Sequence, residues 1–400
     1  MTGLRGDAAV VGFVELPAQR HPVDKNLFGL EQWSVLAAAA LEDAGLSAGE
    51  VDGLVTGVGV ESAVFAPATL AEYLGIAVNF GEFVDLGGAT AAGAVWRAAA
   101  AIELGICRAV LIVMPGGLPP SSPHFPRSEP PWLGSSSGRY GSPQAEFEIP
   151  YGFVGQNSAY AQIARLYEHT YGYDARALAK ISADQRENAC ATPGAIFHGK
   201  PISVDDVLSS PMVSDPLHRL EVVMPVAGGA GVVVANKDLA RRSKNKPVWV
   251  AGFGERVTHK SPSNARDMLR SPLADAADTA FSMAEVSRDA VDIASIYDCY
   301  TITVLLSLED AGFCDNGKGA EFVNSHDLTF RGDFPLNTAG GQLGYGQAGL
   351  AGGMHHVVDG VRQLMGRAGD AQVSDAEVAF VSGNGGLMSE QVALVLKGDK

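Results

Sequence analysis

The sequence predicts an α/β protein made of two similar halves. Short apolar runs rich in β-branched residues follow helical segments, as in buried strands of an α/β sheet, and segments of the first half reappear in the second. The composition agrees, because 400 residues with 46% apolar and 18% charged side chains can bury a large core.

The first predicted helix lies within residues 26–46. Its apolar side chains recur at helical spacing, at Leu30, Trp33, Ala37, Leu41 and Ala44. Gly45 follows at the position of a helix C-cap. We therefore expect an amphipathic helix that ends near residue 45.

Three apolar runs predict strands: VDGLVTGVGV at 51–60, AVLIVM at 109–114 and GVVVAN at 231–236. Each follows a helical segment and is apolar on both faces, a pattern typical of buried parallel strands. The first half is therefore expected to be α/β.

The second half repeats this plan. Residues 39–55 resemble residues 280–296, with Ser47 matching Ser287 and Val51-Asp52 matching Val291-Asp292. A second echo pairs the small-residue turn and helix from Gly87 with those from Ala348. We place the boundary in the polar stretch at residues 243–246, which gives halves 1–245 and 246–400.

Between Pro115 and Pro150 the chain holds nine of its 21 prolines, which indicates a long loop without secondary structure. The loop contains GSSSG at 134–138, which matches the nucleophile pattern G-x-S-x-G, but the strand and helix that this pattern requires are missing from the sequence around it. A helix with a packing face should follow, with Tyr160, Ile163, Ala164, Tyr167 and Tyr171 on that face.

The charge and the cysteines exclude several functions. A net charge of −16 repels phosphate backbones, so nucleic acid is not an expected partner. We expect a cytosolic protein, because residues 1–20 do not read as a signal peptide and no apolar run is long enough to span a membrane. The four cysteines are scattered without a C-x-x-C pair and predict buried reduced thiols, not a disulfide or zinc site.

The stretch GYGQAG at 344–349 matches the dinucleotide fingerprint G-x-G-x-x-G. The segment before it is polar and glycine-rich instead of an apolar strand, and the nearest acidic residue, Asp359, comes too early. Seven glycines between Asn337 and Gly353 fit two other uses: backbone N–H groups that approach an anionic ligand at a helix start, or close packing between loops. The helix that follows turns an apolar face to the core, with Leu350, Met354, Val357, Val358, Val361, Leu364 and Met365.

Three blocks carry a resemblance to a known family: IYDCYTITVLLSLEDAGFC at 296–314, LNTAGGQLGYGQAG at 336–349 and VSGNGG at 381–386. The chain resembles the thiolase superfamily, in particular its sterol-carrier, lipid-transfer type. Those proteins read H-D-C-F and N-x-x-G-G-x-x-x-x-G-H-P at the first two blocks. The resemblance implies a thiolase-like five-layer αβαβα fold of two similar halves.

The departures from the family concern the reacting groups. Gly88 stands where the nucleophilic cysteine is found, Gln347 replaces the histidine of G-H-P, and the last block has neither cysteine nor histidine. Without a thiol, thiolysis through an acyl-enzyme is excluded. The same blocks have instead gained three phenols, those of Tyr297, Tyr300 and Tyr345.

A thiolase fold without cysteines and with added tyrosines resembles the thiolase-like aldolases that shorten steroid side chains. The resemblance implies retro-aldol cleavage of a β-hydroxyacyl-CoA with a tertiary hydroxyl, giving a 17-ketosteroid type of ketone and propionyl-CoA or acetyl-CoA. No cofactor is expected, because the CoA thioester is itself the substrate.

We predict Tyr297 and Tyr345 as the proton-transfer pair, without assigning the base. Backbone donors are expected at Gly88, Gly340 and Gly341, and further substrate contacts at Asp298, Tyr300, Asn337 and Gln347. Asp298 either polarises a phenol or is structural, and Gln347 is expected to donate to the thioester oxygen. His218 is unassigned. His355 and His356 lie on the helix beyond the glycine turn and are expected to be solvated or packed, with the alternative left open that one of them faces the site.

The resemblance also implies a homodimer and a small second protein with a zinc ribbon and an OB-fold, together forming a heterotetramer. Two alternatives stay open. One is a non-catalytic lipid or acyl-CoA binder, and the other is an acyltransferase with Thr90 or Ser382 as its nucleophile.

Overall fold

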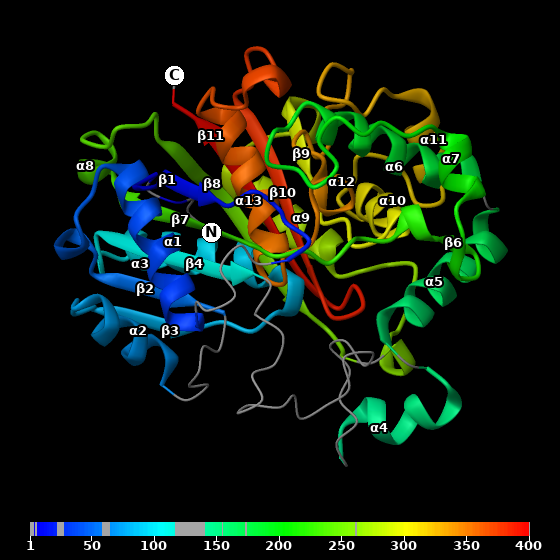
Figure 1. Ribbon diagram of the computed structural model, residues 1–400, viewed down its shortest axis with the longest axis horizontal. Helices are drawn as coiled ribbons and strands as arrows, with labels where there is room; N and C mark the ends of the chain where they lie inside the picture. The colour runs from blue at the N-terminus through cyan, green and yellow to red at the C-terminus, as the bar shows by residue number, and fades with distance from the viewer. Residues whose placement is uncertain are drawn as a thin grey trace.

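The computed structural model describes residues 4, 6–21, 28–57, 65–116, 141–153, 155–172, 174–260 and 262–399. A nine-stranded mixed sheet runs through the molecule in the order β3-β2-β4-β7-β1-β8-β11-β10-β9 (Figure 1). The first half contributes β1 (Ala8–Glu15), β2 (Gly53–Thr56), β3 (Phe80–Phe83), β4 (Ala109–Gly116) and β7 (Gly228–Asn236). The second half contributes β8 (Val248–Val257), β9 (Ile293–Ser295), β10 (Val378–Gly385) and β11 (Glu390–Gly398).

The helices of the first half that pack on the sheet are α1 (Gly29–Ala44), α2 (Ala66–Leu74), α3 (Thr90–Glu103) and α8 (Lys237–Ala240). A helical region follows β4, with α4 (Pro143–Phe147), α5 (Gly155–Tyr171), α6 (Ala175–Cys190) and α7 (Val204–Ser209), and includes the short strands β5 (Met212–Ser214) and β6 (Leu217–His218). The second half adds α9 (Leu273–Ala284), α10 (Thr301–Asp310), α11 (Gly319–Ser325), α12 (Gly341–Tyr345) and α13 (Ala351–Leu364).

The helices form layers around the two halves of the sheet. α1 and α2 cover the outer face of the first half, and α9 covers the outer face of the second. α3 and α13 contact strands of both halves and lie between them, and Figure 1 shows α13 beside the central strands β1 and β8. This arrangement is the predicted five-layer αβαβα order.

The internal repeat predicted from the sequence is present in the fold. The end of α1, the short helix η1 (Ala48–Glu50) and β2 correspond to the end of α9, the short helix η7 (Arg288–Ala290) and β9. Both helices end in a left-handed residue: Gly45 with φ 72° and Glu285 with φ 53°. The predicted C-cap at Gly45 is therefore correct. The equivalent position of α9 is Glu285, for which a left-handed backbone is less favourable than for glycine.

The direction predicted for residues 231–236 is wrong. β2 runs parallel to β3 and β4, but β7 runs antiparallel to β4 and β1. Gly116 at the end of β4 pairs with Gly228 at the start of β7. The chain therefore leaves β4 and enters β7 at the same end of these two neighbouring strands. An apolar run has the same composition in either direction, which is why the sequence did not reveal this.

The predicted loop at 115–150 is only partly correct. β4 extends to Gly116, and α4 and the short helix η4 (Ile149–Tyr151) interrupt the loop at its end. The Ser142 hydroxyl accepts a hydrogen bond from the Ala145 N–H, and Pro143 occupies the first turn, so local capping starts α4. The GSSSG stretch lies outside the described residues.

The helix predicted after this loop is α5, and its packing face is as expected except at its end. Tyr160, Ile163, Ala164 and Tyr167 are buried, whereas Tyr171 is 43% exposed. In the parts of the chain that the structure describes, no helix is both long and apolar enough to cross a membrane.

Candidate functional site

Tyr297 and Gly88 meet at the centre of the molecule. Tyr297 follows β9, and Gly88 lies in the short helix η2 (Gly87–Ala89) that leads into α3. A Cβ atom at residue 88 would lie 2.2 Å from the Tyr297 hydroxyl oxygen and 2.4 Å from the Asn384 carbonyl oxygen. The phenol thus fills the space that any side chain at position 88 would need.

The hydroxyl of Tyr297 is buried among amide side chains. The Gln347 Nε2 donates to it at 3.5 Å, and the Tyr297 backbone N–H donates to Ser382 Oγ at 3.1 Å. Burial raises the pKa of Tyr297 well above its usual value, while the amides of Gln347 and Gln342 lower it by a smaller amount. The side chain is therefore a neutral phenol at physiological pH.

Asp298 joins the turn after β9 to the glycine-rich segment. Its fully buried carboxylate accepts hydrogen bonds from the N–H groups of Gln342 at 2.8 Å and Leu343 at 3.0 Å, in the first turn of α12. A Cβ at Gly341 would lie 2.2 Å from Asp298 Oδ2, so this close approach requires glycine. Asp298 thus positions α12 beside Tyr297.

Asn337 has a similar supporting position. Its side-chain oxygen accepts from the Ile296 N–H at 2.7 Å, and its side-chain nitrogen donates to the Ile296 carbonyl at 2.9 Å. The Asn337 amide thus hydrogen-bonds to both backbone groups of Ile296, the residue that precedes Tyr297.

Close packing accounts for two other glycines of the segment. A Cβ at Gly340 would lie 2.6 Å from Ala189 Cβ, and one at Gly344 would lie 2.8 Å from the same atom. Helix α6 therefore packs directly on the backbone of α12. At these two positions the alternative of close packing, and not ligand access, explains the glycine.

Tyr345 lies in a different environment from Tyr297. Its hydroxyl donates to the Leu16 carbonyl at 3.2 Å, and its ring lies 4.3 Å from the His355 ring, measured between centroids. Burial, and after it the charge of Glu15, raises the pKa of Tyr345. The structure thus brings Tyr297 together with Gly88, Asp298 and Gln347, but places the Tyr345 hydroxyl toward the end of β1.

Beside Tyr345 is a buried ion-pair cluster. Glu15 is only 4% exposed; its carboxylate lies 2.7 Å from His355 Nδ1 and also pairs with Arg362. Burial opposes the charge, but these two cations outweigh it and lower the pKa of Glu15 to about 2. Glu15 in turn raises the pKa of His355 against the effect of burial. Glu15, Tyr345 and Arg362 also line a cavity of about 500 Å³.

His356, the next residue of α13, turns to the Tyr297 side. Its Nε2 lies 2.9 Å from Asp298 Oδ1, and its ring lies 5.6 Å from the ring of Tyr297. Sequence reasoning treated both histidines as packed or solvated, and missed them and Glu15 as site residues. A usable signal was present: two consecutive imidazoles in the first half of the helix that directly follows the glycine turn.

Tyr300 belongs to an aromatic cluster with α5. Its hydroxyl donates to Asn157 Oδ1 at 2.6 Å, and its ring stacks on Tyr160 at 4.3 Å. Asn384, whose carbonyl faces Gly88, donates through its side chain to the Tyr160 hydroxyl at 3.2 Å. Tyr300 is thus linked to the Gly88 site through a second layer of side chains.

The hydroxyls and thiols near the site are poor nucleophiles. Thr90 Oγ1 accepts from the Leu86 N–H at 2.9 Å, and Ser382 Oγ accepts from the Tyr297 N–H. Burial raises the pKa of the Cys299 thiol to about 12, and those of Cys107 and Cys314 to about 12 as well. These thiols are therefore protonated at neutral pH.

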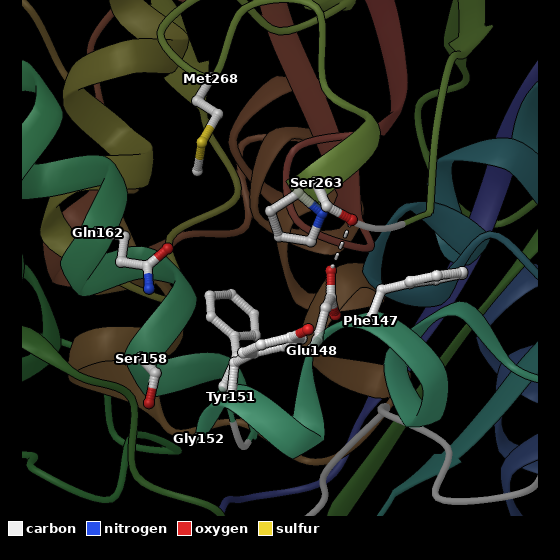
Figure 2. Close-up of a pocket in the computed structure, with 10 residues that line it drawn as sticks. Phe147, Glu148, Tyr151, Gly152, Ser158, Gln162, Ser263 and Met268 are labelled. Atoms are coloured by element: carbon white, nitrogen blue, oxygen red, sulfur yellow. Dashed lines mark hydrogen bonds between the residues drawn. The ribbon is translucent and has the colours of Figure 1, made fainter.

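A further cavity of about 320 Å³ lies between η4, α5 and residues 262–268 (Figure 2). Its walls include Tyr151, Phe153 and Met268, and the Ser263 hydroxyl donates to Glu148 at 3.5 Å across it. None of the predicted site residues lines this cavity. Within the described ranges, no group of three or more His, Cys, Asp or Glu side chains is placed to hold a metal ion.

Comparisons with known proteins identify the fold. The family profile described as "Thiolase C-terminal domain-like" matches residues 254–398. A solved structure, the "Ltp2-ChsH2(DUF35) aldolase", superimposes with a TM-score of 0.86 and 26% identity over 100% of both chains. The chain therefore has a thiolase-like fold, and its C-terminal part matches the thiolase C-terminal domain profile.

Two curated relatives match nearly the full length of the chain. A "17-hydroxy-3-oxo-4-pregnene-20-carboxyl-CoA lyase" of Mycobacterium tuberculosis is 28% identical over 96% of this chain and 97% of its own. A "steroid side-chain-cleaving aldolase" of Thermomonospora curvata is 28% identical over the same shares. An acetyl-CoA acetyltransferase of Methanothermobacter thermautotrophicus is 33% identical, but the match spans only 60% of that protein.

Proposed function

We propose that this protein is an aldolase that cleaves a β-hydroxyacyl-CoA with a tertiary hydroxyl by a retro-aldol reaction. The proposed substrate is the CoA thioester of a steroid side chain, and the products are a 17-ketosteroid type of ketone and propionyl-CoA or acetyl-CoA. The observation that carries the proposal is the Tyr297 hydroxyl in the space above Gly88. The two nearly full-length relatives, named a lyase and an aldolase, support the same reaction.

The reaction requires two proton transfers and no covalent enzyme adduct. The tertiary hydroxyl loses its proton, the C–C bond between the carbinol carbon and the α-carbon breaks, and its electron pair becomes the thioester enolate. The ketone leaves, and a proton adds to the α-carbon to give the shorter acyl-CoA. One proton is removed and one is returned, so no proton is consumed overall.

In this proposal Tyr297 and Tyr345 are the proton-transfer pair. Tyr297 stands over Gly88, where Gln347 reaches the same hydroxyl and is available to donate to the thioester oxygen. Gly88 and Gly341 are the proposed sources of backbone donors, whereas the Gly340 N–H already donates to the Asn337 carbonyl at 2.7 Å and is not available. Asn337, Asp298 and Tyr300 support the substrate pocket. Both phenols have raised pKa values and are neutral before substrate binds. The phenol that acts as the acid therefore starts protonated, and the phenol that acts as the base must pass its own proton to a neighbouring group as it accepts the proton of the substrate hydroxyl.

The first test is cleavage of a steroid CoA thioester bearing a tertiary β-hydroxyl, with both products quantified. Tyr297→Phe and Tyr345→Phe should each reduce kcat by about 10²-fold or more, the usual contribution of a proton-transfer group. Tyr171→Phe, at an exposed position of α5, is the matched control and should retain full activity. Near-normal turnover in both site variants would reject the assignment of the two phenols.

We also propose a homodimer that binds a small partner protein with a zinc ribbon and an OB-fold, giving a heterotetramer. Support comes from the similar solved structure, whose name pairs Ltp2 with ChsH2(DUF35). Co-expression followed by size-exclusion chromatography tests this proposal. Full activity of the chain purified alone, with no complex formed, would contradict it.

The second candidate is a non-catalytic lipid or acyl-CoA binder. The observation that favours it is the Tyr345 hydroxyl, which already donates to the Leu16 carbonyl. Tight binding of a steroid CoA thioester without release of ketone would support this function. An acyltransferase would instead leave an acyl group on the protein, so an unchanged protein mass after exposure to acyl-CoA excludes the use of Thr90 or Ser382 as a nucleophile.

A further inference from the structure

Helix α13 contains two consecutive buried histidines, and each contacts one of the two candidate phenols. His355 lies against Tyr345 and pairs with Glu15. His356 lies against Tyr297 and pairs with Asp298. Neighbouring residues of a helix point about 100° apart, so a single turn of α13 reaches both phenol environments.

His356 has the closer connection to the Gly88 site. It is completely buried, and its Nε2 approaches both Asp298 Oδ1 at 2.9 Å and the amide nitrogen of Gln342 at 3.2 Å. Because a carboxylate only accepts hydrogen bonds, His356 is the donor to Asp298. The imidazole therefore donates from Nε2 to the buried carboxylate and lies in packing contact with the Gln342 amide, without accepting a hydrogen bond from it.

Both of these neighbours act on Tyr297. Asp298 is its chain neighbour and holds the first turn of α12 through two backbone N–H groups. Gln342 lies in that turn, and its amide, together with that of Gln347, lowers the pKa of the phenol against the larger effect of burial. A shift of Gln342 or of the start of α12 would thus change the hydrogen bonds at the Tyr297 hydroxyl.

We infer that His356 is a positioning residue for Tyr297, which acts by holding the Asp298 carboxylate and the Gln342 amide in place around the phenol. The kinetic test of this inference rests on the proposed aldolase function, because it measures cleavage of the proposed substrate. Buried networks of this kind have little tolerance for a missing member, because each remaining polar group loses a partner. An apolar residue at position 356 should therefore disturb Tyr297 without touching the substrate.

The kinetic test is a double-mutant cycle with steroid CoA thioester as substrate. His356→Leu should lower kcat roughly tenfold, with KM within about twofold, a coupling of the size seen within hydrogen-bonded networks. His356→Gln keeps a nitrogen donor at the same reach and should recover most of the rate. In a Tyr297→Phe background His356→Leu should have no further effect, whereas in a Tyr345→Phe background its effect should persist.

A multiplicative loss in the Tyr297→Phe background would overturn the inference, because a general structural defect lowers any residual activity. Gln342→Met provides a second route if His356→Leu does not fold, since Asp298 then keeps its backbone and imidazole partners. It should also lower kcat and show no added effect with Tyr297→Phe.

A readout independent of activity separates this inference from the proposed function. In protein labelled with 3-fluorotyrosine, the ¹⁹F signal of Tyr297 is assigned by its loss in Tyr297→Phe. That signal should shift in His356→Leu and return toward its original position in His356→Gln, while His169→Leu on α5 serves as a control that leaves it unchanged. An unshifted signal in both His356→Leu and Gln342→Met would refute the positioning role, even if the enzyme cleaves its substrate; a shifted signal without any cleavage would refute the aldolase proposal alone.

Discussion

At the scale of single residues, the absence of a side chain at position 88 is what admits the Tyr297 phenol. The hydroxyl lies within 2.2 Å of the place where a Cβ would be, and the Asn384 carbonyl is almost as close. Real non-bonded atoms do not approach so closely, so a larger residue must displace the phenol, the carbonyl or the start of α3.

Gly88→Ala should therefore lose activity and stability together. Overpacking of this kind costs about 1–3 kcal/mol of unfolding free energy, and the displaced phenol should reduce kcat by about tenfold or more. Urea denaturation and steady-state kinetics measure the two effects. Gly49→Ala, where a Cβ would meet nothing within 4 Å, is the control and should be neutral; equal behaviour of the two variants would show that the space above residue 88 is not needed.

The sequence was informative for Tyr297 and less so for Tyr345. Tyr297 was chosen through the resemblance of its block, and the structure places it two residues after β9, where its hydroxyl lies beside Gly88. The direction of Tyr345 depends on the local backbone, where Gly344 continues a helix and Gly346 has φ 112°. A glycine-rich stretch permits several such paths, and its neighbours along the chain do not determine which is taken.

At the scale of secondary-structure elements, α13 organises both phenol environments and ties the end of β1 to the core. The ion-pair cluster at that end couples the stability of the fold to pH. Its Glu15 has a lowered pKa of about 2, whereas its His355 has a raised pKa. The two partners therefore lose their contributions at opposite ends of the pH range.

The signs give a defined pH window. The contribution of Glu15 is complete above its ordinary pKa of 4.5 and is lost as pH falls toward about 2. The contribution of His355 is complete below its ordinary pKa of 6.5 and is lost as pH rises through its higher folded value. Both are present together between pH 4.5 and 6.5.

Glu15→Gln should accordingly be most destabilised, relative to the parent protein, between these two values. The difference should shrink as pH rises above 6.5 toward the raised pKa of His355 in the folded parent, because the imidazolium partner of Glu15 is lost there. Urea denaturation at a series of pH values measures this. Glu321→Gln, at an exposed pair with Lys318, should show a small difference that does not depend on pH in that range; a parallel curve for Glu15→Gln would contradict the assigned ion pair.

The contact between α6 and α12 provides another test at this scale. Gly344→Ala would place a Cβ 2.8 Å from both Ala189 Cβ and the Gln185 carbonyl oxygen. We expect a loss of about 1–3 kcal/mol in unfolding free energy and reduced activity, because α12 carries both Gln342 and Tyr345. Ala189→Gly in the same chain should relieve part of the clash, and additive effects of the two substitutions, measured by denaturation, would argue against direct contact.

Periodicity was sufficient to predict α1, α5 and α13, because each shows its buried face in the sequence, and α3 was predicted from its similarity to the turn and helix that start at Ala348. The direction of β7 and the existence of α4 were not predicted. The first depends on where the chain re-enters the sheet, and the second on a short capping sequence inside a proline-rich region. Contacts between residues far apart in the sequence determine the direction of β7, and a few local hydrogen bonds determine the start of α4. Neither can be read from the composition of these segments.

At the scale of the whole molecule, the two halves of the sheet are joined by few backbone pairs. β1 and β8 pair only at Ala9 with Trp249 and at Val10 with Val248. Side chains reinforce this junction, because Glu255 of β8 binds Arg97 of α3 through two contacts of 2.6 and 3.1 Å and accepts from Trp96 Nε1 at 2.7 Å. A central helix of one half is thus tied to a strand of the other.

Glu255→Gln should weaken this connection. A neutral amide cannot match the bidentate pairing with the Arg97 guanidinium, so we expect a loss of about 2 kcal/mol in unfolding free energy. The unfolding transition followed by Trp fluorescence should also become broader if the halves begin to separate. Glu321→Gln again serves as the exposed control, and a loss as small as that control would show that Glu255 does not join the halves.

Laboratory evolution of this protein toward thiolase-type condensation, which forms an acyl-cysteine, would face an obstacle at one position. A cysteine introduced at residue 88 would arrive in occupied space, between the phenol oxygen and the Asn384 carbonyl. Single-substitution libraries should therefore yield no functioning condensing enzyme. The cysteine introduced at residue 88 would disrupt the fold, and no neighbouring side chain would be placed to deprotonate it. Recovering such chemistry would take at least three coordinated replacements, at residues 88, 297 and 347.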